Sequence, residues 1–234
     1  MTLFAILTLF PDAVEAYASE SLLGSARERG LCEVLTVDFR DFARSKHRTV
    51  DDRPFGGGPG MVLKPEPICA CVEWLENRYG HFRKIALCPT GATFDQARAE
   101  SFTRDERILL LCGRYEGFDA RIFEELELET LSIGDYVLCG GELAALAVVE
   151  ATARLLPGVL GDERSAVEDS FQGDGGLDHP QYTRPREFRG RAVPEVLLSG
   201  DHQAIERWRA EQARTRTREQ RPDLFEDTPR ADSN

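Results

Sequence analysis

Three glycine-bearing segments each follow an apolar, strand-like run, and together they could hold a small molecule through backbone atoms. They are Pro89-Thr90-Gly91, Gly113–Gly117 and Gly134–Gly141. Glycine permits backbone angles that a Cβ forbids and allows close approach to the chain. One such loop alone would more often be a tight strand-to-helix connection. Because ligands of open α/β sheets bind outside the carboxyl ends of the strands, three such loops predict a cofactor lying against main-chain amides and carbonyls. A flat, neutral group such as adenine could be recognised in this way.

Two charged residues outside these loops could act on a substrate, although the residue patterns alone say little about them. Asp169 is an acid in the glycine-rich segment Gly158–Asp178, which shows neither helical nor strand periodicity. Arg154 lies near the end of a helix predicted over Glu142–Leu156, whose first-turn carboxylate suits the positive end of the helix dipole. For both Asp169 and Arg154, a solvated side chain is the alternative interpretation.

A basic, glycine-rich segment spans Asp38–Met61. Its cationic side chains precede the run Pro54–Gly60 and are Arg40, Arg44, Lys46, His47, Arg48 and Arg53. The run lacks the Lys-Ser/Thr of a phosphate-binding P-loop, so a phosphotransferase is disfavoured. The composition is typical of a mobile loop that faces an anion, and an ordinary surface excursion is the alternative. The four isolated histidines and six scattered cysteines show no zinc-ligand spacing.

Alternating strand and helix patterns must position these loops. Strands are predicted over Leu3–Phe10, Leu31–Phe39, Lys84–Cys88, Arg107–Cys112 and Leu128–Ile133, and helices from Pro11, over Leu22–Arg29, Glu66–Tyr79, Asp95–Phe102 and Glu142–Leu156. This alternation predicts an α/β fold with a mainly parallel sheet and helices on both faces. The Ile-Leu-Leu-Leu run of the fourth strand is the most hydrophobic, and we expect it at the centre of the sheet.

Charge is distributed unevenly along the 234 residues. The net charge is −12, yet the segment 183–222 holds ten arginines and six acids. A basic segment in an otherwise acidic chain is typical of a protein that binds a polyanion at one place only. A solvated, salt-bridged helical tail is the alternative interpretation. We expect a first domain over 1–160, a flexible linker over 161–178, and a small, mostly helical domain over 179–234. In that last domain, Asp201 would cap a helix over Gln203–Arg214 and the final residues would be disordered. The sequence shows no membrane span and no signal peptide, so a cytoplasmic location is predicted.

Five blocks of residues, in this order and spacing, resemble a known enzyme family. The blocks are Arg48–Met61, Cys112–Gly117, Ser132–Glu142, Pro157–Gly161 with Glu168–Phe171, and Tyr182–Pro185. The chain resembles the bacterial tRNA (guanine-N1)-methyltransferases, which belong to the knotted SPOUT class of S-adenosylmethionine-dependent enzymes. The resemblance runs from Met1 to about Phe225. It implies a deep trefoil knot in the sheet domain, a rare exception to unknotted topology.

The resemblance also implies where the methyl donor and the RNA bind. The donor would contact the three glycine loops at Pro89, Gly113, Tyr115, Glu116, Ile133, Gly134, Asp135, Tyr136, Val137, Leu138, Gly140 and Gly141. The enzyme would be a homodimer with its active site between subunits, one supplying the donor pocket and the other the Asp169 segment and the C-terminal domain. The substrate would be tRNA, methylated at N1 of guanosine 37 to maintain the reading frame.

By the same resemblance, Asp169 is the base that removes the N1 proton, Arg154 neutralises the negative charge on O6, and Glu116 helps to bind Mg²⁺. Cys139 departs from the family pattern, which commonly has a small hydroxyl residue there. A catalytically silent RNA- or nucleotide-binding module on the same fold is the alternative function, and the presence of both Arg154 and Asp169 argues against it.

Overall fold

The computed structural model describes residues 1–161, 169–173 and 175–225. The chain divides into two compact units, Met1–Gly161 and Asp162–Asn234. The expected disordered tail over 226–234, and part of the expected linker, lie outside the described residues.

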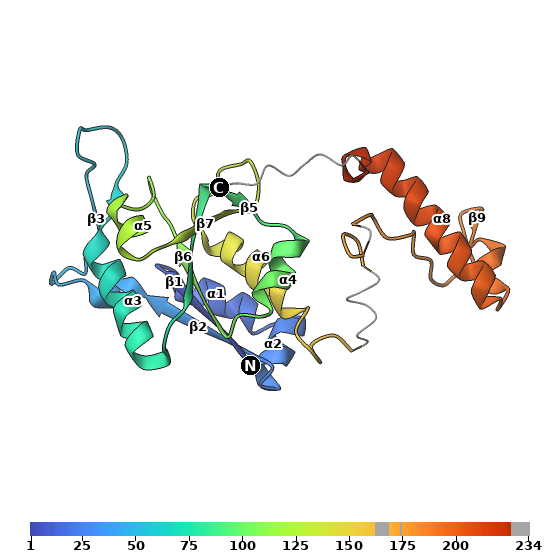
Figure 1. Cartoon of the computed structure of the whole chain (residues 1–234), viewed down its shortest axis with the longest axis horizontal. Helices are drawn as coiled ribbons and strands as arrows, with labels where there is room; N and C mark the ends of the chain where they lie inside the picture. Colours follow the sequence, from blue (N-terminus) through green and yellow to red (C-terminus); the bar gives the residue numbers. More distant parts are fainter. Residues whose placement is uncertain (162–168, 174, 226–234) are drawn as a thin grey trace. The chain divides into compact units, whose positions relative to one another are not determined.

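The first unit is an α/β domain built on a five-stranded parallel sheet (Figure 1). Its strand order is β2-β1-β6-β5-β7. The strands of this unit are β1 (Thr2–Thr8), β2 (Cys32–Asp38), β3 (Asp51–Asp52), β4 (Val62–Leu63), β5 (Arg83–Thr93), β6 (Arg107–Cys112) and β7 (Glu129–Ser132). The helices are α1 (Pro11–Ala18), α2 (Ser21–Glu28), η1 (Phe39–Phe42), α3 (Pro65–Tyr79), α4 (Gln96–Phe102), α5 (Arg121–Glu125) and α6 (Glu142–Ala153).

The central place of β6 confirms the prediction made from its apolar run. The strand lies between β1 and β5, and five of its six residues are buried. Ile108, Leu110 and Cys112 join one core cluster, whereas Leu109 and Leu111 join the other. Side chains of a strand alternate between the two faces, so a strand covered on both sides must be apolar throughout.

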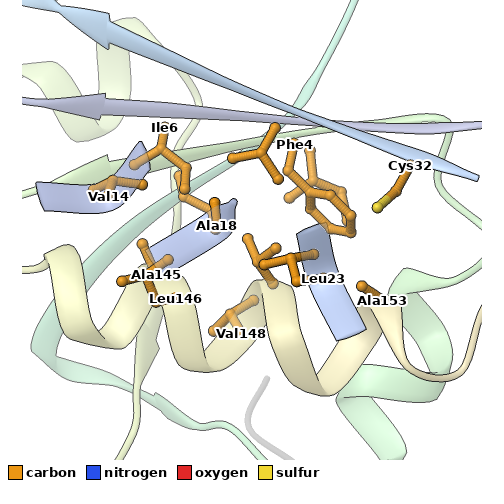
Figure 2. Close-up of a cluster of buried hydrophobic side chains, with 14 of the residues drawn as sticks. Phe4, Ile6, Val14, Ala18, Leu23, Cys32, Ala145, Leu146, Val148 and Ala153 are labelled. Atoms are coloured by element: carbon orange, nitrogen blue, oxygen red, sulfur yellow. The ribbon is translucent and has the colours of Figure 1, made fainter. Parts of the chain in front are cut away.

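Helices cover both faces of the sheet, as the alternating pattern predicted. One face packs against α1, α2 and α6, where Phe4 and Ile6 of β1 meet Val14, Leu23 and Val148 (Figure 2). The other face packs against α3, through Ile68, Val72 and Leu75, and against α5 through Ile122. Helix α5 was not expected, because five residues are too few to show a helical period.

One strand boundary was predicted wrongly. The strand expected over Lys84–Cys88 continues as β5 to Thr93, and its register with β7 shifts between Leu87 and Ala92. Pro89-Thr90-Gly91 therefore lies within this irregular part of the strand rather than in a loop after it. A Cβ on Gly91 would come within 2.2 Å of the Leu131 amide nitrogen, so only glycine permits this approach of β5 to β7.

The second unit is built around helix α8 (His202–Gln220), with η2 (Glu195–Leu198), η3 (Pro222–Leu224) and the short hairpin β8 (Glu187–Phe188) and β9 (Arg191–Ala192). Asp201 caps α8 as predicted, because its carboxylate accepts a hydrogen bond from the Ala204 amide at 3.1 Å. The helix runs six residues beyond its expected end at Arg214. Thr217, which is buried, accepts a hydrogen bond from the Leu177 amide at 2.9 Å and so holds the described end of the expected linker against α8.

Candidate functional site

A cavity of about 460 Å³ lies at the carboxyl ends of three adjacent strands, β5, β6 and β7. All three glycine-bearing segments line it. Eleven of the twelve residues expected to contact a cofactor are among its walls: Pro89, Gly113, Tyr115, Glu116, Ile133, Gly134, Tyr136, Val137, Leu138, Gly140 and Gly141. The twelfth, Asp135, is exposed and does not line the cavity. The strand order thus brings together residues as far apart in the sequence as Pro89 and Gly141.

The second and third segments are held together by their backbones. The Gly141 amide donates to the Gly113 carbonyl at 3.1 Å, and Arg114 forms an isolated antiparallel bridge with Gly140. A Cβ on Gly141 would lie 2.7 Å from the Cα of Cys112, so a side chain there would push the two segments apart. Gly134 has φ of +149°, a conformation that residues with a Cβ rarely adopt.

Tyr115 also has a left-handed backbone, with φ of +59°. A non-glycine residue in this region is strained by on the order of 1 kcal/mol or more, and such strain is concentrated at functional sites. Tyr115 is 61% exposed as a residue, and Tyr136 on the third segment is 55% exposed. Both aromatic side chains border the cavity and could cover a ligand within it.

A partly buried ion pair supports the wall of the cavity, and the sequence gave no indication of it. Arg114 contacts the Glu142 carboxylate at 2.9 Å, and its guanidinium also donates to the Cys139 carbonyl at 3.3 Å. The hydroxyl of Thr8, at the end of β1, donates to Glu142 at 2.7 Å. The Glu142 side chain is 8% exposed. The sequence did place a carboxylate at the start of α6, but it gave no sign of partners 28 and 134 residues away.

Neighbouring ionisable groups have perturbed pKa values. Burial, reinforced by Glu142, raises the pKa of the Cys112 thiol well above its ordinary value, so this cysteine is a packing residue rather than a nucleophile. The Arg121 side chain lowers the pKa of Asp119, which follows the second segment, to about 2. Asp119 is therefore an anion at neutral pH and is already paired.

The two residues expected to be catalytic lie in different units. Arg154 follows the last residue of α6 in the first unit, and its side chain is partly buried. The cavity is lined by Gly141 and Ala144, at the other end of this helix. Arg154 is not among the residues that line this cavity, and the ten residues that separate it from Ala144 rise roughly 15 Å along the helix. Asp169 lies in the second unit and is exposed.

Glu116 lies on the cavity wall and is exposed. Among the described residues, no group of three or more His, Cys, Asp or Glu side chains is arranged to hold a metal ion. A lone carboxylate is not a complete ligand set, although Mg²⁺ keeps several waters and commonly takes its other ligands from a substrate. Magnesium binding at Glu116 stays a prediction.

Comparisons with known proteins connect this geometry to an activity. Residues 2–227 match the family model described as tRNA (Guanine-1)-methyltransferase TrmD. A protein named tRNA (guanine-N(1)-)-methyltransferase from Anaeromyxobacter sp. (strain K) is 55% identical over 221 residues, which cover 94% of this chain and 89% of the relative. Proteins of the same name from Rhodopirellula baltica and Geobacillus kaustophilus are 53% and 50% identical, over 95% and 97% of this chain and 93% of each relative.

The chain belongs to the tRNA (guanine-N1)-methyltransferase family.

The matched residues 2–227 include the cavity-lining residues, Arg154 and Asp169, because the match extends from the first unit into the second. It confirms the family named from the five sequence blocks. In the part of the chain that the structure describes, no helix is both long enough and apolar enough to cross a membrane.

Proposed function

We propose that this protein transfers a methyl group from S-adenosylmethionine to N1 of guanosine 37, the nucleoside on the 3′ side of the tRNA anticodon. The observation that carries the proposal is the cavity in a chain of this family, walled by the glycine segments of three neighbouring strands. Its volume of about 460 Å³ falls within the range of roughly 300–1,000 Å³ that is usual for small-molecule sites.

The chemistry of the cavity walls suits this donor. Leu87, Phe118 and Ile133 provide apolar surface for a flat ring, and main-chain groups from the three glycine-bearing segments surround it. S-adenosylmethionine supplies an electrophilic methyl group when it is bound. The protein's own residues must hold the donor, exclude water and manage the proton on the guanine.

Guanine N1 carries a proton and is a poor nucleophile at neutral pH. We propose that Asp169 accepts this proton as N1 attacks, so that the methyl–N1 bond forms while the N1–H bond and the donor's methyl–sulfur bond break, which would leave the donor as a neutral thioether. Negative charge develops on O6 as the N1 proton leaves, and the guanidinium of Arg154 stabilises it through a charge-assisted contact until the methyl group is bound. The target base must leave its stack to reach these groups, as is usual for enzymes that modify bases.

The position of Arg154 supports a site shared between two copies of the chain. Arg154 is separated from the cavity of its own chain by the length of α6. A second copy could bring its Arg154 and Asp169 to that cavity. The first unit also exposes large apolar side chains that suit a second copy: Phe10, Tyr17, Val137 and Leu143. The homodimer, the knot in the sheet domain and the cytoplasmic location are further parts of this proposal.

Methyl transfer from tritiated S-adenosylmethionine to unmodified tRNA transcripts tests the activity. We expect transfer to a transcript with guanosine at position 37 and none to a matched transcript with adenosine there. Asp169→Ala should lose transfer at least 100-fold while calorimetry shows donor affinity unchanged. Unchanged turnover in Asp169→Ala would remove this residue from the mechanism, and absence of transfer by the unaltered protein would remove the proposed function.

Complementation tests the shared site. Arg154→Ala removes the cation, and Thr90→Trp places a large ring at an exposed position on the cavity wall. Each variant alone should be inactive. Refolded together, they form a mixed dimer in which one site combines an intact cavity with an intact Arg154, so activity should return. If each cavity used the Arg154 of its own chain, mixing would restore nothing.

A further inference from the structure

A nine-residue loop, residues 53–61, leaves the sheet domain beside the cavity. It connects β3 to β4, which pair as a short antiparallel ribbon, and Figure 1 shows it projecting from the sheet domain. The base of the ribbon is fixed to the second glycine-bearing segment. The Glu116 amide donates to the Met61 carbonyl at 3.0 Å, and the Leu63 amide donates to the Gly117 carbonyl at 2.9 Å. Because Glu116 and Gly117 line the cavity, the loop begins at the cavity edge.

The tip of this loop presents an aromatic ring without packing partners. Phe55 is 101% exposed, more than any other large hydrophobic residue that the structure describes. Gly56, Gly57 and Gly58 follow it with positive φ, and a Cβ on any of them would meet nothing within 4 Å. The loop is thus free of packing at its tip and fixed at its base. Packing within the sheet domain gives no reason for an aromatic side chain at this position.

Exposed cationic side chains precede the aromatic ring by two to eleven residues in the sequence. Arg44, Lys46 and Arg53 are exposed, and within the described part of the chain they form no ion pair. By contrast, Arg40, Arg48 and Lys64 are paired with Asp38, Asp41 and Asp52. Arg53 stands two residues before Phe55, and an exposed cation without an ion pair there, in a chain of net charge −12, favours contact with a polyanion. An exposed aromatic ring combined with such cations is the combination that binds single-stranded nucleic acid by stacking.

We propose that Phe55 stacks on an unpaired nucleobase of the RNA substrate next to the target guanine, while Arg53 contacts a neighbouring phosphate. This inference rests on the proposed function, because it takes the RNA to be the substrate that reaches the cavity. The stacked base holds the neighbouring strand at the cavity edge when the target base is extruded. Stacking depends on the aromatic face and not on hydrogen bonds, so the contact tolerates any base.

The test uses anticodon stem-loop RNAs that carry 2-aminopurine on either side of the target, because stacking quenches its fluorescence. Phe55→Leu keeps an apolar side chain without the ring, and Phe55→Trp restores a larger ring. We expect Phe55→Leu to bind RNA roughly 5-fold to 100-fold more weakly and to lose the quenching, and Phe55→Trp to match the original protein. Donor affinity and the thermal midpoint should not change.

The charged residues have a matched control. Arg53→Gln should reduce the slope of log affinity against log salt by about 1. Arg104→Gln should not, because Arg104 is exposed and precedes the amino end of β6, at the edge of the sheet opposite the cavity.

Equal RNA affinity and equal quenching in Phe55→Leu and the unaltered protein would overturn the inference while leaving methyl transfer intact. Dissociation of the dimer in Phe55→Leu would also overturn it and show a protein contact instead. Absence of guanine methylation by the unaltered protein would instead refute the proposed function.

Discussion

Replacing Glu142 by alanine should destabilise the sheet domain by about 3 kcal/mol. The carboxylate is 8% exposed, and its loss would leave Arg114, whose side chain is 25% exposed, without its acid. It would also leave the buried Thr8 hydroxyl without an acceptor. Breaking a fully buried ion pair costs about 3–5 kcal/mol, and an unsatisfied buried hydroxyl costs about 1–3 kcal/mol. Because Arg114 is partly exposed and water can solvate it, the expected loss falls below the sum of these two costs, at about 3 kcal/mol.

Urea unfolding followed by tryptophan fluorescence measures this change. The chain has two tryptophans, so a Trp208→Phe background leaves Trp74 of α3 to report on the sheet domain alone. Protomer concentration must be held constant, because association stabilises the folded state. Glu150→Ala is the control, since Glu150 lies on the exposed side of the same helix and accepts a hydrogen bond from Tyr17. We expect it to cost less than about 1 kcal/mol.

The same substitution should weaken binding of the methyl donor. Arg114 bridges Glu142 and the Cys139 carbonyl, so losing the acid frees one end of the third glycine-bearing segment. Calorimetry with S-adenosylmethionine should show a loss of roughly tenfold or more for Glu142→Ala and none for Glu150→Ala. If the two variants were equally stable and bound the donor equally well, Glu142 would be no more than a helix-terminal acid and this reasoning would be refuted.

Two further predictions follow from the first unit. Gly141→Ala should reduce donor affinity at least tenfold by calorimetry, because the new Cβ would lie 2.7 Å from the Cα of Cys112. Gly161→Ala should have no effect, because a Cβ at Gly161 would meet nothing within 4 Å. Equal donor affinities in the two variants would show that the loop adapts to the added methyl group. Burial raises the pKa of the Cys71 thiol from 9.0 to about 12, so the unfolded chain loses this proton at a lower pH than the folded chain does. The free energy of unfolding should therefore fall from pH 9 toward pH 12, by up to about 1.4 kcal/mol per pH unit. Urea midpoints against pH should fall less steeply for Cys71→Ala, and parallel curves would contradict the shifted pKa.

Local patterns in the sequence were sufficient for the main elements of the first unit. The apolar run in β6 indicated a strand buried on both faces, and the three- and four-residue spacing after Gly141 indicated α6. The glycine-bearing segments could be recognised as ligand-binding segments, because glycine at a strand end permits unusual backbone angles and close approach of a ligand to the main chain. Arg154 and Asp169 were different: their residue types alone did not separate a catalytic side chain from a solvated one, and the family resemblance assigned their roles.

Only the tertiary structure decided how these pieces meet. Strand order and register depend on packing between distant segments. The sequence therefore predicted one ligand against the three glycine-bearing segments, but not the order β6-β5-β7 that brings them together or the continuation of β5 through Pro89 to Thr93. The contact of Thr8 with Glu142 spans 134 positions. Arg154 lies at the opposite end of α6 from the cavity-lining residue Ala144. The distance between them can be calculated from the sequence only if the helix is known to be continuous. Local propensity acts within a few residues, whereas the site is assembled by contacts across the whole sheet.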